Sequence, residues 1–404
     1  MGASFGKAQK NDDLEPGELP DYNHRRSTKD GEGIDVCQLL SGDGLFLCGI
    51  SDPFSIWKGL FVCVKKGGMS LSGLMTRKLW KVAALCILVA AICTGCKGME
   101  LGARAGGTAY TVTDKQGTVV EMPAKPHRIL TLSMSTDEIV LGLVKPDHMV
   151  AVNQMLDDPI SSNVVSLAQQ VETKVRNPSV EEIVALQPDL VIVPDWGDVT
   201  RVQSLRDLGL KVVVCKGAKN LAEVQETVRL IAQAVGEPER GETLIGKMDS
   251  KLAEIQAKVA KIPEAERKSV VLISLMKSYG GIGCSFDDAC QYAGVKNGMA
   301  KLDIHNGQAM TKEQLVAINP DYLFLPTYTN HGKYDIEKFR AGYLEDPALK
   351  SLKAIRNNGL RDPYEGYLYN CSQDFVFGVQ EIAYQVYGDD FKQDKTEHLT
   401  AVDE

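Results

Sequence analysis

The chain has 404 residues, of which 44% are hydrophobic and 24% charged, so it is long enough to bury at least two cores. These proportions exclude a disordered, collagen-like or polytopic membrane protein. The formal charge of -8 gives no electrostatic reason to expect nucleic acid as a partner, because such binding needs clustered basic charge.

The first 74 residues show neither helical nor strand periodicity over any long window, and they precede a complete export signal. We expect residues 1–74 to be an upstream extension outside the mature protein, with the true start at Met75 or Met69. The alternative is a small cytoplasmic domain on a signal anchor.

Residues 75–95 have the pattern of a secretory signal, with a basic stretch at 77–81 and an apolar run at 82–92. The run is shorter than the ~20 residues that a membrane-spanning helix needs. Small residues precede Cys96, which resembles a bacterial lipoprotein signal, although Cys93 stands where leucine is usual. We therefore expect lipidation at Cys96, with ordinary cleavage or an uncleaved anchor as alternatives. The stretch 96–108 is rich in glycine and alanine and predicts a flexible tether.

An N-terminal lobe is predicted over 109–238. Residues 110–122 predict a β-hairpin that turns at Asp114–Gly117. Short apolar runs then alternate with helical patterns, namely HRILTLS, MVAVN, DLVIVP and KVVVCK. This alternation indicates βαβ units and a parallel sheet. It restarts at SVVLIS and continues through YLFLP and EGYLYNC, which predicts a C-terminal lobe over 264–391 and a tail over 392–404.

A single long helix is predicted between the lobes, over 239–263. Its apolar residues recur at alternating spacings of three and four, and Pro238 and Pro263 limit it. One helix would therefore join the two lobes.

The chain contains an internal repeat, in which PSVEEIVALQPDLVIVP at 178–194 is echoed by MTKEQLVAINPDYLFLP at 310–326. Each copy begins with a capping box, Ser179 with Glu182 and Thr311 with Gln314. Capping does not require the glutamate that each copy carries at the same offset, at positions 181 and 313.

These motifs, together with KPHRILTLSMSTDEIVLGL and GLKVVVCKGAKNLAEVQETVRLIAQAVG, resemble the periplasmic binding proteins for iron-siderophores, heme and cobalamin. The resemblance covers residues 110–391. It implies an α/β fold of two Rossmann-like lobes linked by a single long α-helix, with a metal chelate (Fe or Co) bound between them. It also implies delivery of that chelate to an ABC importer, and the chain is expected to have no intrinsic cofactor and no catalytic residues.

Ligands of open α/β sheets bind beyond the carboxyl ends of the strands. The loops at those ends give the candidate ligand-binding residues, which are Ser133, Met134, Asp195, Trp196, Ser278, Tyr279, Thr327, Tyr328 and His331. Trp196 could stack on a flat ligand, or it could cover the strand end as part of the core. Most of the tyrosines are expected to be packing residues.

The resemblance also assigns a partner. In the family, glutamates at the positions of Glu181 and Glu313 dock onto arginines of the permease dimer, which works with an ATPase. Stabilisation of the helix dipole is the alternative role of both carboxylates. We expect a monomer that is exported and held on the cell membrane by its lipid anchor, facing the periplasm or the cell exterior.

Two other functions stay open. A receptor for a bare divalent metal would use the histidines at 127, 148, 305 and 331, but these lack paired spacing. An enzyme on the same fold is opposed by the absence of GxSxG, P-loop, HExxH and GxGxxG motifs in the sequence. Cys284 and Cys290 are near enough in sequence to bridge, or they are buried free thiols.

Overall fold

In the computed structural model, residues 108–329 and 334–402 are described. The predicted extension, signal and lipidation site therefore lie outside the described residues, as does His331. The predicted hairpin is confirmed as β1 (Tyr110–Thr113) and β2 (Val119–Met122), an antiparallel pair. Asp114 closes its turn by accepting hydrogen bonds from the amides of Gln116 and Thr118, and Gly117 supplies a φ of +80°.

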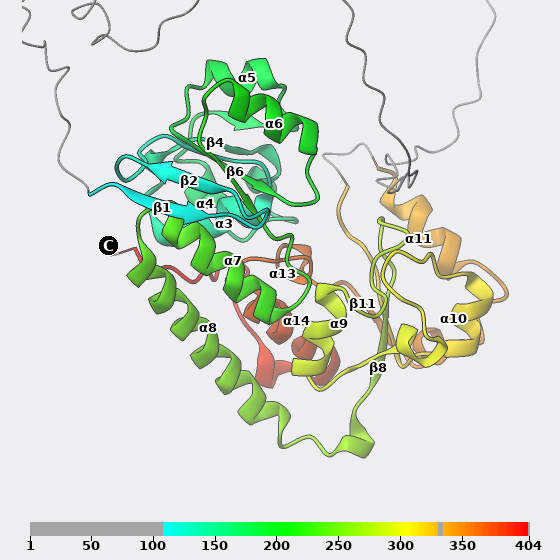
Figure 1. The fold of residues 1–404 in the computed structure, drawn as a ribbon. Coiled ribbons are helices and arrows are strands. Elements are labelled where there is room, and N and C mark those ends of the chain that lie inside the picture. The colour runs from blue at the N-terminus through cyan, green and yellow to red at the C-terminus, as the bar shows by residue number, and fades with distance from the viewer. Residues whose placement is uncertain (1–107, 330–333, 403–404) are drawn as a thin grey trace, which may run out of the picture. The chain divides into compact units, whose positions relative to one another are not determined.

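The N-terminal lobe contains a parallel sheet of five strands in the order β5-β4-β3-β6-β7. Its strands and helices are, in chain order, β3 (Ile129–Thr131), α3 (Met134–Leu143), β4 (Met149–Asn153), α4 (Val165–Ala168), β5 (Lys174–Val175), α5 (Val180–Ala185), β6 (Leu190–Pro194), α6 (Val199–Asp207), β7 (Val212–Cys215) and α7 (Leu221–Ala234). Alternate residues of β6 enter different clusters, because both faces of the sheet are covered by helices. Figure 1 shows these helices around the sheet.

The C-terminal lobe contains four parallel strands in the order β11-β10-β8-β9. Its strands and helices are β8 (Ser269–Leu272), α9 (Ser285–Tyr292), β9 (Lys296–Asn297), α10 (Lys312–Ile318), β10 (Tyr322–Phe324), α11 (Ile336–Leu344), α12 (Lys353–Arg356), β11 (Leu360–Arg361), α13 (Glu365–Leu368) and α14 (Phe375–Tyr387). The predicted α/β class with two Rossmann-like lobes is confirmed.

A long helix, α8 (Pro238–Val259), connects the lobes. Its apolar stripe is buried, including Ile245, Met248 and Leu252, as the spacing of three and four predicts. The helix starts at its proline, which suits the first turn, and ends four residues before Pro263. None of the helices in the described ranges is long and apolar enough to cross a bilayer.

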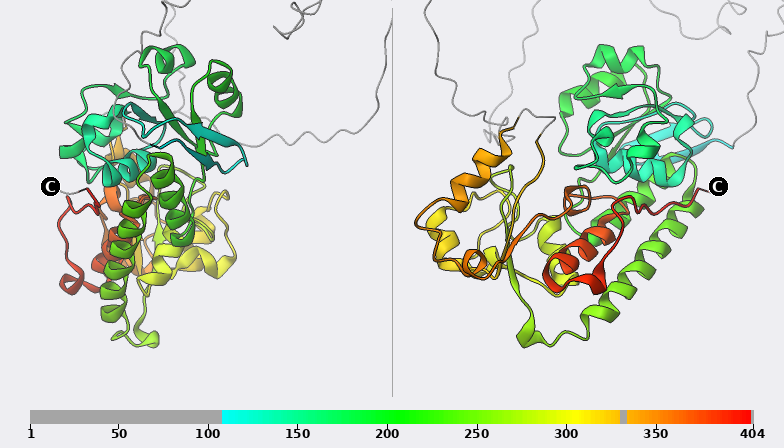
Figure 2. Two further views of the ribbon diagram at one scale, coloured as in Figure 1. Left: turned by 60° about the vertical axis from the view of Figure 1, so that its left-hand side comes forward. Right: turned by 180° about the vertical axis from the view of Figure 1, so that it is seen from behind.

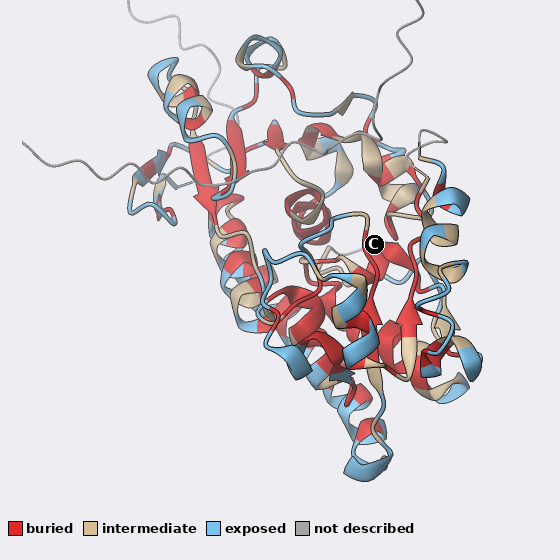
Figure 3. Cartoon of the chain, turned by 90° about the vertical axis from the view of Figure 1, so that its right-hand side faces the viewer, coloured by how far each residue is buried: buried red, intermediate tan, exposed pale blue. Residues whose placement is uncertain are grey.

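Helices of both lobes share one hydrophobic cluster. Side chains of α3 and α7 from the N-terminal lobe, of α9, α13 and α14 from the C-terminal lobe, and of α8 belong to it. Figure 3, coloured by burial, shows buried residues (red) on the inner parts of the helices and strands and exposed ones (pale blue) on their outer parts. The two lobes are therefore held by α8 and by direct packing.

One predicted strand is wrong. The sequence predicts a strand at EGYLYNC, 365–371, but Glu365–Leu368 form the helical turn α13, and the strand beside β10 is the short β11. All four residues of α13 are buried, and the amide of Gly366 donates to the carbonyl of Ile160 in the N-terminal lobe. Contacts with the other lobe thus override the local β propensity.

Cys284 and Cys290 are free thiols, and both are buried. Burial raises the pKa of each thiol. The interpretation as structural free cysteines is confirmed.

Two buried carboxyl groups of α3 give the fold a pH dependence. Burial raises the pKa of Asp137 and of Glu138 to about 8, and the charge of Asp374 adds to the shift of Glu138. An unfolded chain loses these protons near pH 4 to 5, whereas the folded chain keeps them to about pH 8. The free energy of unfolding therefore falls as the pH rises through this window.

We expect Glu138→Gln to remove one such proton while its amide oxygen still accepts from the Asn370 side chain, now 2.8 Å from Glu138 Oε2. The stability of Glu138→Gln relative to the native chain should rise between about pH 5 and pH 8, with a slope approaching one proton. Urea unfolding at several pH values measures this. Exposed Glu264→Gln is the matched control, and a difference between Glu138→Gln and the native chain that did not vary with pH would contradict the assignment.

Candidate functional site

Each sheet has a topological switch point, at which the strand order reverses. In the N-terminal lobe it lies between β3 and β6, and in the C-terminal lobe between β8 and β10. Crevices at the carboxyl ends of such strands are where open α/β sheets bind ligands. The described candidate ligand residues all follow these four strands, at 133–134, 195–196, 278–279 and 327–328.

Ser133 and Met134 begin α3. The Ser133 hydroxyl caps the helix by accepting from the Thr136 amide at 3.3 Å, and it lies 2.8 Å from the Thr136 hydroxyl. Met134 is half-buried and packs against the shared cluster. Both residues therefore shape the end of β3 in addition to any contact with a ligand.

Trp196 is the aromatic residue presented most openly at these strand ends, because 60% of its surface is exposed. Its indole lies against Gly217, in the loop after β7, where an added Cβ would stand 2.3 Å from the indole Cδ1. Asp195 Oδ1 accepts from the Gly217 amide at 2.9 Å and so ties the two loops together. Sequence reasoning missed Gly217, because its role is visible only when the loops after β6 and β7 are adjacent.

In the C-terminal lobe, Ser278 is exposed and Tyr279 is half-buried. The Tyr279 hydroxyl is 2.8 Å from the Ser285 hydroxyl, and its ring centroid is 5.3 Å from that of Tyr369. Burial raises the pKa of the Tyr279 phenol well above its ordinary value, so this hydroxyl stays neutral. Met276, in the same loop, leaves 45% of its surface exposed.

Thr327 and Tyr328 follow β10 and are held by Glu365. One carboxylate oxygen of Glu365 accepts from the Thr327 amide, from the Thr327 hydroxyl at 3.1 Å and from the Tyr328 amide at 2.9 Å. Burial raises the pKa of Glu365, while these hydrogen bonds oppose the rise. Sequence reasoning missed Glu365 because it placed this residue in a strand.

Contacts across the lobes lie close to these loops. The Tyr364 hydroxyl donates to the carbonyl of Ser162 at 2.6 Å, and the Gly366 amide donates to the carbonyl of Ile160 at 3.0 Å. The loop after β11 is thereby joined to the loop after β4. Within the described ranges, no group of three or more His, Cys, Asp and Glu side chains is arranged to hold a metal ion.

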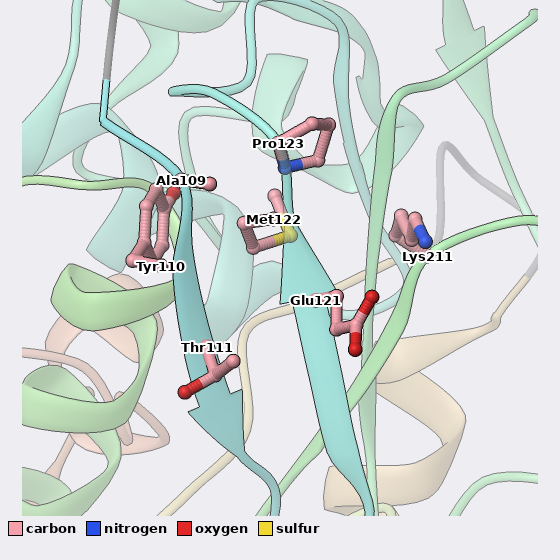
Figure 4. Close-up of a pocket in the computed structure, with 7 residues that line it drawn as sticks. All are labelled: Ala109, Tyr110, Thr111, Glu121, Met122, Pro123 and Lys211. Atoms are coloured by element: carbon pink, nitrogen blue, oxygen red, sulfur yellow. The ribbon is translucent and has the colours of Figure 1, made fainter.

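A pocket of about 360 Å³ lies elsewhere, at the β1–β2 hairpin. Figure 4 shows its lining, which includes Tyr110, Glu121 and Lys211. Lys211 precedes β7, so this pocket lies at the amino end of that strand, away from the switch point. It does not belong to the candidate ligand site.

The two repeats place equivalent side chains on the two lobes. Both predicted capping boxes are confirmed, so Glu182 and Gln314 serve the helix starts. Glu181 and Glu313 are exposed in the first turns of α5 and α10. Hydrogen bonds from its own backbone amide and from the Thr311 hydroxyl lower the pKa of Glu313, so its carboxylate is charged at neutral pH.

Comparisons with known proteins agree with this architecture. The chain is 25% identical over 289 residues to the uncharacterized ABC transporter substrate-binding lipoprotein YvrC of Bacillus subtilis, covering 70% of this chain and 87% of that one. It is 26% identical over 223 residues to a cobalamin-binding protein of Halobacterium salinarum, covering 54% of this chain and 58% of that one. The apo structure of the periplasmic heme-binding protein RhuT from Roseiflexus has the same fold, with a TM-score of 0.56 and 22% identity, covering 65% of this chain and 98% of that one.

A family profile described as periplasmic binding protein matches residues 129–362, which run from β3 of the first lobe to the end of β11 in the second. That match spans more than half of the chain and includes both sheets, their switch points and the helix between them. These proteins bind and deliver solutes and are not enzymes. The chain belongs to the periplasmic binding protein family.

Proposed function

We propose that this protein is the substrate-binding component of an ABC importer and that it captures a metal chelate, namely a ferric siderophore, heme or a corrinoid. The observation that carries the proposal is the exposed Trp196 indole at the switch point of the N-terminal lobe. An aromatic face of this kind suits a flat, partly apolar ligand. The similarity to a cobalamin-binding protein supports the same class.

The ligand would be held between the carboxyl ends of the two sheets. Ser133, Met134, Asp195 and Trp196 would contact it from the first lobe, and Ser278, Tyr279, Thr327, Tyr328 and His331 from the second. The chelate is cargo, and the protein contributes no cofactor of its own.

Absorbance titration of the purified full-length protein with heme, a ferric siderophore and a corrinoid tests the proposal. We expect saturable binding of one class. If none of the three ligands bound and the protein instead bound a bare divalent ion or an oxyanion, the proposal of a metal chelate would be contradicted.

The Trp196 surface gives a sharper expectation. Trp196→Ala should weaken binding of that chelate by roughly 1 to 3 kcal/mol, the range for an aromatic anchor, while Trp196→Phe should retain most of the affinity. Gly217→Ala keeps the indole but adds a methyl group where the indole now lies, so it should also weaken binding. Unchanged affinity with a lowered unfolding temperature would show that Trp196 is a packing residue.

We further propose that Glu181 and Glu313 dock the protein onto the permease, one from each lobe. Their exposure supports this role, and the capping boxes are completed by the side chains of the neighbouring Glu182 and Gln314. Val184 and Val316 lie one helical turn further along the same faces and expose 41% and 38% of their surface. Each lobe would thus present a carboxylate beside an apolar side chain to an equivalent surface of a two-fold partner.

The double change Glu181→Ala with Glu313→Ala should abolish most uptake while leaving ligand affinity intact, because charges at the rim of an interface govern encounter and orientation. Uptake of radiolabelled ligand by cells measures this. Glu264→Ala with Glu266→Ala removes the same charge at exposed positions and is the matched control. Full uptake by the first double variant would leave only the helix-dipole role.

Membrane attachment through Cys96 completes the proposal, supported by the lipoprotein relatives. The mature protein should begin with an acylated Cys96 after a start at Met75, as mass spectrometry would detect. Cys96→Ser should move the protein from the membrane to the soluble fraction. A mature chain that retained any of residues 1–74 would refute this start.

A further inference from the structure

The C-terminal segment, Lys392–Val402, contacts both lobes. On the side of the C-terminal lobe, the Tyr367 hydroxyl donates to the carbonyl of Asp394 at 2.8 Å, and the Gln373 side chain donates to the carbonyl of Leu399 at 3.3 Å. On the side of the N-terminal lobe, the Ala401 amide donates to the carbonyl of Gly142 at 2.8 Å. Figure 2 (right) shows this red segment reaching the N-terminal lobe.

The contacts converge on Asp374, which directly precedes α14 and is fully buried. Its carboxylate meets the Asn163 amide group at 2.7 Å, the His398 Nδ1 at 2.6 Å and the Leu399 amide at 2.8 Å. Asn163 belongs to the N-terminal lobe, and the other two residues to the C-terminal segment. One carboxylate therefore joins the first lobe, the second lobe and the end of the chain.

Two neighbouring contacts are also buried. The Asn370 side chain donates to Glu138 Oε2 at 2.8 Å, and the Gln373 side chain donates to the carbonyl of Glu138 at 2.9 Å. A further contact, from Lys247 Nζ of α8 to the carbonyl of Thr400 at 2.5 Å, lies at the exposed edge of the segment. Hydrogen bonds shielded from water hold a geometry more firmly than exposed ones, so this network opposes displacement of one lobe against the other.

Close approach at this point depends on a glycine. A Cβ added to Gly142 would stand 2.7 Å from the Gln373 side-chain nitrogen and 3.0 Å from the carbonyl oxygen of Leu399. Gly142 lies in α3, where alanine is a better helix former than glycine. The site thus carries a residue that weakens the helix but lets the C-terminal segment approach.

We propose that the C-terminal segment is a clasp that fixes the orientation of the two lobes, with Asp374 and His398 at its centre. A single helical connection leaves the lobes only one covalent link, and the clasp adds hydrogen bonds across the same boundary to the packing of the shared cluster. By fixing the lobes, the clasp fixes the spacing of the candidate ligand-binding loops. None of its residues is a candidate ligand-binding residue, so its effect does not depend on which solute is bound.

Amide hydrogen exchange of the full-length protein tests the clasp. Three amides report on it, those of Leu399, Ala401 and Gly366, the last bonded to Ile160 across the lobes. In the native chain all three should be protected. In Gly142→Ala they should exchange at least about tenfold faster, while the core strands β6 and β8 keep their protection. Gly342→Ala, where a Cβ meets no atom within 4 Å, is the matched control and should change none of them.

His398 gives a second comparison. His398→Asn keeps a side-chain N–H for Asp374 and should restore protection that His398→Ala loses. If His398→Ala fails to fold because it leaves a buried carboxylate with fewer partners, Gly142→Ala decides the matter alone. Native-like exchange of Gly366 and Leu399 in folded Gly142→Ala would overturn the clasp, as would unprotected Leu399 and Ala401 amides in the native chain.

Discussion

The fold depends on the burial of helices from both lobes in one hydrophobic cluster. Helix α8 supplies the covalent connection, and its apolar stripe packs with α3 and α7 on one side and α14 on the other. Because α14 is apolar around most of its surface, it is stable only with neighbours on several sides. This shared core sets the position of one sheet relative to the other. It therefore also sets the relative position of the candidate ligand-binding loops at the strand ends.

Burial has a cost at the same boundary. Glu138 and Asp374 lie within it with almost no exposed surface, and each needs partners to offset the loss of water. The partners of Glu138 and Asp374 come from the opposite lobe and from the C-terminal segment. Hydrophobic burial is non-directional, whereas hydrogen bonds require a particular geometry of donor and acceptor. The polar groups therefore specify the orientation that the apolar groups stabilise.

The proposed functional surfaces lie where the core ends. At the switch points, the carboxylates of Asp195 and Glu365 accept hydrogen bonds from backbone amides. These bonds hold the loops that carry Trp196 and Thr327. On the repeat helices, each capping box uses two polar residues and leaves the intervening glutamate exposed on each lobe. Both features suit the proposed function, in which the loops bind a solute and the two glutamates meet a two-fold partner.

The sequence by itself determined the α/β class, the two lobes, the hairpin, the connecting helix and both capping boxes, because each depends on periodicity or spacing within one short segment. It also located the described strand-end residues, since those follow directly from the strands. It failed at 365–371, where packing against the other lobe turns a β-prone stretch into a helix. Gly217, Glu365 and the contacts of Asp374 with Asn163 and His398 were decided only by the tertiary structure, because each joins residues far apart in the chain, and no local pattern records such a contact.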